Sequence, residues 1–182
     1  MSALSSFRIR RGGPDDAVSL AAFAAATFAD AFGADNQAHD LQAHLDASYG
    51  PKQQARELAD PTVTTLLAHA GDKLIAYAQV RRNDALPACV RSPDAIELQR
   101  FYVDRAAHGT GVATALMSAV HEVAREAGAP RIWLGVWERN ARALAFYRKV
   151  GFLDVGSKFF DVGADRQTDR VLVAVVRAAS TR

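Results

Sequence analysis

The segment from residue 95 to residue 127 constrains the fold most strongly, because a strand, a glycine turn and a helix follow one another without a break. Residues 95–103 are largely apolar, and apolar residues recur at helical spacing from 110 to 127. Gly109 and Gly111 remove Cβ atoms from the turn, so a bulky group can lie against its backbone. The helix that follows directs unpaired amides and the positive end of its dipole into the same gap. The turn therefore predicts an anion site, most simply one for a pyrophosphate.

Three interpretations of this turn compete, and spacing separates them. A nucleotide-triphosphatase loop places a Lys and a Ser or Thr directly after its last glycine, whereas Val112 and Ala113 follow Gly111 here. A dinucleotide fingerprint starting at Gly109 needs a third small residue at position 114, which is Thr114, and its strand would open a βαβ unit rather than end an antiparallel meander. The third interpretation, a glycine turn that only starts a helix, remains open for the loop taken alone.

The remaining periodicity predicts a mixed α/β domain with a central sheet over residues 1–182. Strands are expected at 7–11, 62–70, 73–82, 95–103, 131–137, 152–160 and 170–177. Helices are expected at 15–31, 36–49, 52–58, 110–127 and 140–150. Gly71 and Asp72 predict a hairpin between the second and third strands, and residues 83–94 predict a polar loop.

Charge is distributed unevenly along the chain. Residues 12–51 contain six aspartates and no Lys or Arg, so they carry −6, whereas the rest carries +8 and the whole chain +2. A basic body suits a phosphate-rich cofactor, and an acidic front suits a cationic partner. The alternative for most of these aspartates is that they are solvated or cap helices, as expected for Asp15 and Asp16.

Several functional classes are disfavoured by composition. The single cysteine, Cys89, excludes an internal disulfide framework and a cysteine-based zinc site, and the five histidines are scattered, so we expect no metal. Residues 1–13 contain no apolar stretch, and Asp30 interrupts the alanine-rich run from Leu20 well short of a membrane span. We expect a cytoplasmic protein with neither a membrane nor a nucleic acid as its partner.

Two separated motifs resemble those of the GNAT superfamily of acetyl-CoA-dependent N-acetyltransferases. The pyrophosphate motif of that family, Arg/Gln-x-x-Gly-x-Gly/Ala, corresponds to His108, Gly111 and Ala113. Its second signature, Asn-x-x-Ala-x-x-Phe-Tyr followed by Gly-Phe, corresponds to residues 140–152. Shorter strings at 28–32, 133–138 and 167–169 look like the bacterial spermidine/spermine N-acetyltransferase subgroup. The resemblance implies a single-domain GNAT-like α/β (α+β) fold, with a mostly antiparallel, mixed central sheet of about seven strands flanked by helices.

The resemblance also implies how acetyl-CoA is bound. The backbone of Phe101, Tyr102 and Val103 would pair with the pantetheine arm, and Asn140 would hydrogen-bond to it. The backbone amides of Gly109, Thr110, Gly111, Val112 and Ala113 would hold the pyrophosphate. His108 stands where the family has Arg or Gln, so the side-chain part of this site departs from the pattern. Arg142, Arg148 and Lys149 would contact the 3′-phosphate or, alternatively, form a solvated helix face.

Transfer of an acetyl group to an amine requires a proton acceptor for the amine and a proton donor for the departing thiolate. Tyr147 is the expected donor, because its ordinary pKa of about 10 is close to that of a thiol. Glu97 and Gln99 are two residues apart on one strand and should face the same side. Gln99 cannot take up a proton, so Glu97 is the expected acceptor, working through water. An edge salt bridge from Glu97 to Arg81 or Arg100 is the alternative.

The acceptor is expected to be a small polyamine such as spermidine or spermine. In the family the acceptor pocket is built near the turn between the first helices, where Asp30 and Asp35 lie. The acceptor-binding candidates on this basis are Phe28, Asp30, Phe32, Asp35, Glu97 and Gln99. A different amine acceptor, or an acetyl-CoA-binding domain without catalysis, remains open, although the presence of Tyr147 and Glu97 argues against the latter. The apolar final strands are compatible with a homodimer.

Overall fold

The computed structural model describes residues 6–32, 42, 45, 47–82, 85–162 and 165–176. The strands are β1 (Arg8–Arg11), β2 (Val63–Ala70), β3 (Lys73–Arg81), β4 (Ile96–Val103), β5 (Arg131–Trp137), β6 (Leu153–Val162) and β7 (Asp165–Val175). The helices are α1 (Ala17–Phe32), α3 (Pro51–Ala59), α4 (Val112–Glu126) and α5 (Ala141–Lys149), with short 3₁₀ turns η1 (Pro14–Asp16) and η2 (Arg105–Ala107).

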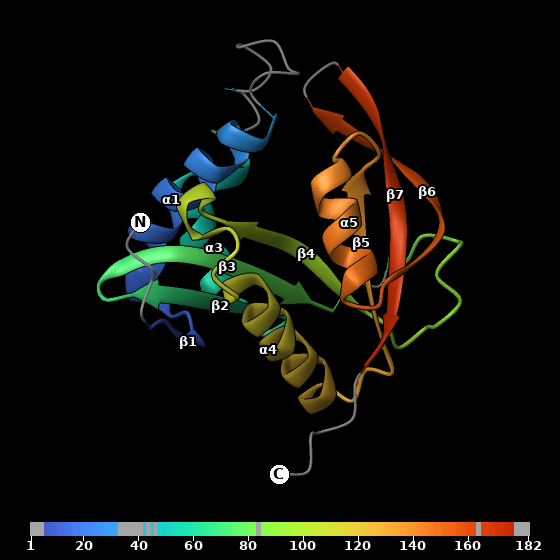
Figure 1. Cartoon of the computed structure of the whole chain (residues 1–182), viewed down its shortest axis with the longest axis horizontal. Coiled ribbons are helices and arrows are strands. Elements are labelled where there is room, and N and C mark those ends of the chain that lie inside the picture. Colours follow the sequence, from blue (N-terminus) through green and yellow to red (C-terminus); the bar gives the residue numbers. More distant parts are fainter. Residues whose placement is uncertain are drawn as a thin grey trace.

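One mixed sheet forms the centre of the molecule, with the strand order β1-β2-β3-β4-β5-β7-β6 (Figure 1). Neighbouring strands are antiparallel except for β4 and β5, which are parallel. Helices α4 and α5 pack on one face, and α1 packs on the other with α3 beside it. The predicted α/β architecture with a mostly antiparallel sheet of seven strands is confirmed.

The parallel strands β4 and β5 pair over only a short stretch, so the sheet is split in its middle. Strands β4 and β5 pair only at Ile96 with Ile132 and at Glu97 with Trp133. Beyond these pairs the two strands diverge (Figure 1), so residues 98–103 of β4 have a paired strand only on the β3 side. An extended ligand can therefore enter the split and pair with the backbone of β4.

A β-bulge in β4 determines which of its side chains face which side. Leu98 pairs with Val80 and Arg100 pairs with Gln79, so Gln99 is an extra residue. The bulge shifts the alternation of side chains along the strand. Ile96, Leu98, Phe101 and Val103 consequently pack with the core under α4, while Arg100 and Tyr102 face α1 and α3.

Three apolar clusters hold these layers together. The largest joins α4 and α5 to the sheet and includes Leu116, Met117 and Phe152, all essentially inaccessible to solvent. A second cluster joins α1 to the opposite face through Leu20 and Phe28. The third lies under the loop between β3 and β4, where Leu86, Cys89 and Val90 cover Trp133, Val171 and Val173. The loop between β3 and β4 thus covers the part of β5 and β7 that lies beside the split.

Most predicted boundaries agree with the structure within a few residues, and the C-terminal strands differ most. The expected strands at 152–160 and 170–177 are one long hairpin, because β6 extends to Val162 and β7 already begins at Asp165. Residues 166–170 are mostly polar, so their participation in the sheet gave no hydrophobic signal. The first helix is preceded by η1, in which Asp16 accepts a hydrogen bond from the Gly13 amide at 2.8 Å. The helix expected at 36–49 lies largely outside the described residues.

Candidate active site

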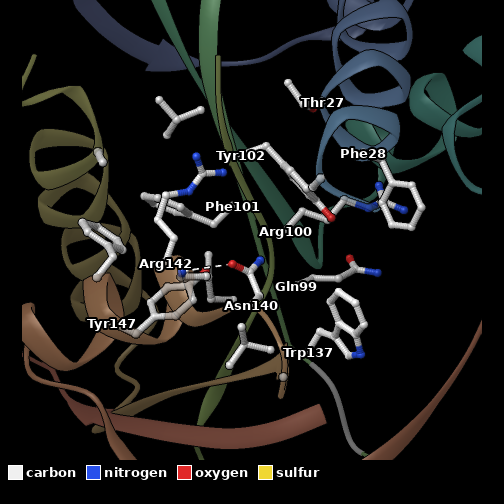
Figure 2. A pocket seen from close by; sticks show the side chains of 18 of the residues that line it. Thr27, Phe28, Gln99, Arg100, Phe101, Tyr102, Trp137, Asn140, Arg142 and Tyr147 are labelled. Atoms are coloured by element: carbon white, nitrogen blue, oxygen red, sulfur yellow. Dashed lines mark hydrogen bonds between the residues drawn. The ribbon is translucent and has the colours of Figure 1, made fainter. Parts of the chain in front are cut away.

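A pocket of about 1020 Å³ extends from the start of α4, across the split between β4 and β5, to the side of the sheet that carries α1. In Figure 2, Phe28, Gln99 and Trp137 lie on one side of this pocket, and Arg142 and Tyr147 lie on the other. Asn140 lies between these two groups. The pocket therefore connects the predicted anion site with the predicted acceptor site in one continuous space.

The glycine turn forms one end of the pocket. Gly109 and Gly111 have φ angles of +79° and +88°, and a Cβ added to either would meet no atom within 4 Å. Gly111 is the N-cap of α4, and its carbonyl accepts the first helical hydrogen bond from Ala115 at 3.1 Å. The amides of residues 112–114 precede that bond and have no partner within the helix. Open space, unpaired amides and a helix dipole converge at this point, as an anion site requires.

His108 connects this turn to the end of β4. Nη1 of Arg142 lies 3.2 Å from His108 Nδ1, and His108 Nε2 lies 3.2 Å from the Val103 carbonyl oxygen. A guanidinium group can only donate, so Nδ1 accepts, and the neutral ring then donates from Nε2 to Val103. In this arrangement His108 orients Arg142 at the mouth of the pocket, a contact that the sequence did not indicate.

Two neighbours in the turn point elsewhere. The Thr110 hydroxyl donates to the Ala107 carbonyl at 2.7 Å, and the Val112 side chain is buried in the core. Neither side chain therefore contributes to an anion site; the Val112 amide remains available, whereas the Thr110 amide already donates to the Ala107 carbonyl at 3.4 Å. Of the three cationic candidates on α5, Arg142 and Lys149 line the pocket, whereas Arg148 is exposed and does not.

Asn140 and Tyr147 are fixed by helix α5. Asn140 is the N-cap of this helix, and its Oδ1 accepts a hydrogen bond from the Ala143 amide at 3.1 Å. Its side-chain amide lines the pocket. The Tyr147 ring packs edge-on against Phe101 and Phe152, with centroid distances of 6.2 and 5.5 Å. Burial raises the pKa of the Tyr147 phenol well above its usual value, so the phenol is protonated at neutral pH, but its pKa no longer lies close to that of a thiol as the sequence suggested.

Glu97 lines the pocket but is held by an ion pair. Its Oε2 accepts a hydrogen bond from Arg81 Nε at 2.7 Å, and only 6% of its side chain is exposed. Glu97 thus forms a salt bridge with Arg81, which is one of the two partners that the sequence suggested as an alternative to a catalytic role. It does not lie at a sheet edge, because β4 occupies the middle of the sheet.

Arg100, the other candidate partner of Glu97, pairs with Glu57 of α3. Its guanidinium also donates to Gln79 Oε1 at 2.6 Å and lies 4.8 Å from the ring centroid of Tyr49. Tyr49 in turn shares a hydrogen bond with Tyr102. This network was not predicted from the sequence, because only the bulge at Gln99 turns Arg100 toward α3.

The predicted acceptor residues are described only in part. The Phe28 ring is buried against Tyr49 and Tyr102, with centroid distances of 5.2 and 6.5 Å, and it lines the pocket together with Gln99. Asp30 is exposed at the rim of the same pocket. The side chain of Phe32 and the whole of Asp35 lie outside the described residues.

Strands β6 and β7 add three residues that the sequence did not place in the site. Lys158, Gln167 and Asp169 line the pocket, and Gln167 and Asp169 are buried. Burial raises the pKa of the Asp169 carboxyl to about 6, and the charge of Lys158 opposes this shift. The string 167–169 contributed to the family resemblance, but the segment was expected to lie between strands and so suggested no role.

Metal-binding and membrane-spanning features are both absent from the described part of the chain. These residues include no group of three or more His, Cys, Asp or Glu side chains that could hold a metal ion. None of the helices among them is both long enough and apolar enough to cross a membrane.

A family model described as the acetyltransferase (GNAT) family matches residues 26–152. The chain belongs to this family. An uncharacterised N-acetyltransferase of Mycobacterium tuberculosis is 36% identical over 158 residues, which cover 87% of this chain and 96% of that protein. The N-alpha-acetyltransferase RimI of the same organism is 34% identical over 137 residues, covering 72% and 82% of the two chains.

The fold has close structural counterparts. The PaiA N-acetyltransferase of Thermoplasma acidophilum, solved in complex with coenzyme A, superposes with a TM-score of 0.75 at 17% sequence identity, covering 93% of this chain and 99% of that one. The GNAT chain is accordingly an acetyl-CoA-dependent N-acetyltransferase. The open glycine turn and the split beside β4 fit this cosubstrate. The names of these relatives give no common acceptor, so the resemblance to the spermidine/spermine subgroup stays a prediction.

Proposed function

We propose that this GNAT enzyme acetylates a primary amino group of a small polyamine, such as spermidine or spermine, by direct attack of the amine on the thioester. The observation that carries the proposal is the separation of charge along the pocket. Arg142 lies at the end near the glycine turn, beside His108, while the carboxylates of Asp30 and Asp169 lie in the other half. In that half, the cations Arg81 and Arg100 are paired with Glu97 and Glu57, and Lys158 is a third cation, next to Asp169, whose ammonium lies 5.2 Å from the centroid of the Trp133 ring.

Aromatic rings support the same assignment. Phe28, Tyr49 and Tyr102 form one packed group along the acceptor half of the pocket. Ring faces attract cationic groups, and apolar rings favour the methylene segments between the amino groups of a polyamine. Carboxylates combined with rings therefore suit a flexible cation better than an anionic or neutral acceptor.

Acetyl-CoA supplies an activated acyl group, and the protein supplies binding and two proton transfers. The acceptor nitrogen forms a bond to the acetyl carbon, the carbon–sulfur bond breaks, one proton leaves the nitrogen and one reaches the sulfur. For binding, we assign the pyrophosphate to the amides from Gly109 to Ala113 and the pantetheine arm to the backbone of residues 101–103 and the Asn140 side-chain amide. Arg142 and Lys149 would pair with the 3′-phosphate.

The two proton transfers are assigned to Tyr147 and Glu97. Tyr147 is protonated and borders the pocket, so it can donate to the departing sulfur. Glu97 would accept the proton of the amine through a water molecule. Glu97→Gln should lower turnover, and most strongly at low pH, where more of the acceptor is protonated and must lose a proton. A pH–rate profile identical to that of the wild type would remove Glu97 from the mechanism.

A protein N-terminus is the second candidate acceptor, because the RimI relative is an N-alpha-acetyltransferase. The two candidates are separated by offering the purified enzyme acetyl-CoA with spermidine, spermine or a short peptide that has a free α-amino group. We expect acetylated polyamine by mass spectrometry and a kcat/KM for the peptide at least tenfold lower. Acetylated peptide without acetylated polyamine would reject the polyamine assignment and leave the reaction type intact.

A further inference from the structure

Asp169 of β7 is a buried carboxylate that the proposed binding and proton transfers leave unused. It is only 8% exposed and lines the pocket. Within the described part of the chain, its side chain forms no hydrogen bond or ion pair, and the nearby charge of Lys158 lowers its pKa less than burial raises it. Burying a carboxylate without a hydrogen-bond partner costs free energy, and such groups in native proteins usually have one. The missing partner is therefore to be sought in the pocket.

The sheet holds Asp169 at a defined place in the pocket wall. Its neighbours across the strands are Trp137 of β5 and Lys158 of β6, so the three side chains stand in one row on the same face. Gly135 of β5 makes room for this row. A Cβ at Gly135 would lie 2.9 Å from Asp169 Oδ2 and 2.6 Å from Lys158 Cε. The carboxylate thus lies over a notch in the β5 backbone that only glycine provides.

Lys158 compensates the charge of Asp169 only in part. Its ammonium lies 5.2 Å from the centroid of the Trp133 ring, and it forms no ion pair with Asp169 within 4 Å. Another carboxylate on this face, Glu97 of β4, already has a cationic partner in Arg81 of β3. Asp169 therefore lacks the close ion pair that Glu97 has.

We propose that Asp169 binds a second, non-reacting ammonium of the acceptor, and this inference rests on the proposed polyamine function. The amino group that attacks the thioester must be neutral, whereas the other amino group of a diamine stays protonated. A primary ammonium offers three N–H donors and a full charge, which is what an unpaired carboxylate lacks. Trp137, beside Asp169 in the row, adds a ring for the same cation. Asp169 thereby selects diamines and polyamines over monoamines.

The test compares 1,4-diaminobutane with butylamine, which has the same carbon chain and one amino group fewer. The wild type should acetylate the diamine with the higher kcat/KM. Asp169→Asn should lower kcat/KM for the diamine about 10- to 100-fold, as expected for the loss of a charged hydrogen bond, and chiefly by raising KM. Butylamine kinetics should change less than about twofold, because this substrate has no second ammonium.

Asp154→Asn is the matched control, because Asp154 lies on the same hairpin but pairs with Arg170 outside the pocket. It should leave both substrates unaffected. Equal losses for diamine and monoamine in Asp169→Asn would overturn the proposal, as would unchanged diamine kinetics. Wild-type enzyme that acetylates the peptide but neither amine would instead refute the polyamine function on which the proposal rests.

Lys158→Met separates this proposal from one in which Asp169 and Lys158 together bind a zwitterion. Methionine keeps the side chain over Gly135 and removes the charge. For a second ammonium at Asp169, removal of the nearby positive charge should tighten binding of the diamine and so lower its KM. A wild-type preference for 4-aminobutyrate over the diamine, lost in Lys158→Met, would overturn the proposal in favour of a zwitterionic acceptor.

Discussion

At the scale of single residues, Tyr147 meets two requirements of a proton donor to sulfur: it borders the pocket and it is protonated at neutral pH. Tyr147→Phe removes only the hydroxyl and keeps the ring between Phe101 and Phe152. We expect turnover at saturating acetyl-CoA to fall about 100-fold, a typical contribution of general acid catalysis. An unchanged melting temperature would confirm that the packing is retained. Acetylation as fast as in the wild type would exclude Tyr147 as the donor.

Asp169 makes a prediction about stability as well as about binding. Its pKa is about 6 in the folded protein, above the ordinary value of 3.8, because burial disfavours the charged form. The raised pKa means that protonated Asp169 stabilises the fold. This contribution to the free energy of unfolding is fully present below about pH 4 and is lost as the pH rises through 6. Asn has no charge to bury, so Asp169→Asn should melt at a higher temperature than the wild type at pH 7.5 and at a similar one at pH 4. A wild type that is the more stable of the two at pH 7.5 would contradict this explanation.

At the scale of elements, the proposed anion site at the start of α4 can be tested by a substitution there, with the same substitution at the end of α4 as the control. Gly111 precedes the helix with φ +88°, and Gly128 follows it with φ +68°, and a methyl group added at either position would meet no atom within 4 Å. Alanine imposes similar backbone strain at both, on the order of 1 kcal/mol. Gly111→Ala alone places a methyl group against the proposed pyrophosphate. Gly111→Ala should raise the Kd for coenzyme A, measured by calorimetry, at least tenfold, whereas Gly128→Ala should leave this Kd unchanged. Equal affinities of the two variants for coenzyme A would argue against a pyrophosphate at this turn.

The elements also show what could be predicted from sequence. The glycine turn, Asn140 and Tyr147 belong to local motifs, and the predicted succession of strands and helices around them along the chain agrees with the structure. The place of Asp169 in the pocket and the pairing of Arg100 with Glu57 were missed, because both depend on pairing between distant strands. A one-residue bulge at Gln99 turns Arg100 toward Glu57. The register in which β7 pairs with β5 and β6 brings Asp169 close to Gly135. Neither the bulge nor the register of β7 produces a periodic pattern of apolar residues in the sequence.

At the scale of the whole molecule, the described residues expose five large apolar side chains, and four of them lie on the C-terminal hairpin: Leu153, Val155, Phe159 and Val175. Exposed apolar side chains that gather on one element can take part in association. The expected homodimer stays a prediction, and light scattering after size exclusion measures it. We expect twice the chain mass of 19.6 kDa, and Phe159→Glu should shift the population toward monomer. A monomeric wild type at micromolar concentration would reject the dimer.

The proposed function depends on one pocket in which the split between β4 and β5 joins a phosphate-binding end to an acceptor end. Acetyl transfer from acetyl-CoA to an amine is the reaction that this pocket should carry out. Release of free thiol and the mass of the amine can be followed in the same reaction, with purified enzyme, acetyl-CoA and spermidine. We predict one thiol released per acetyl group gained by the amine, with both signals lost in the absence of enzyme. Thiol release without an acetylated amine, across spermidine, spermine and the peptide, would contradict this function.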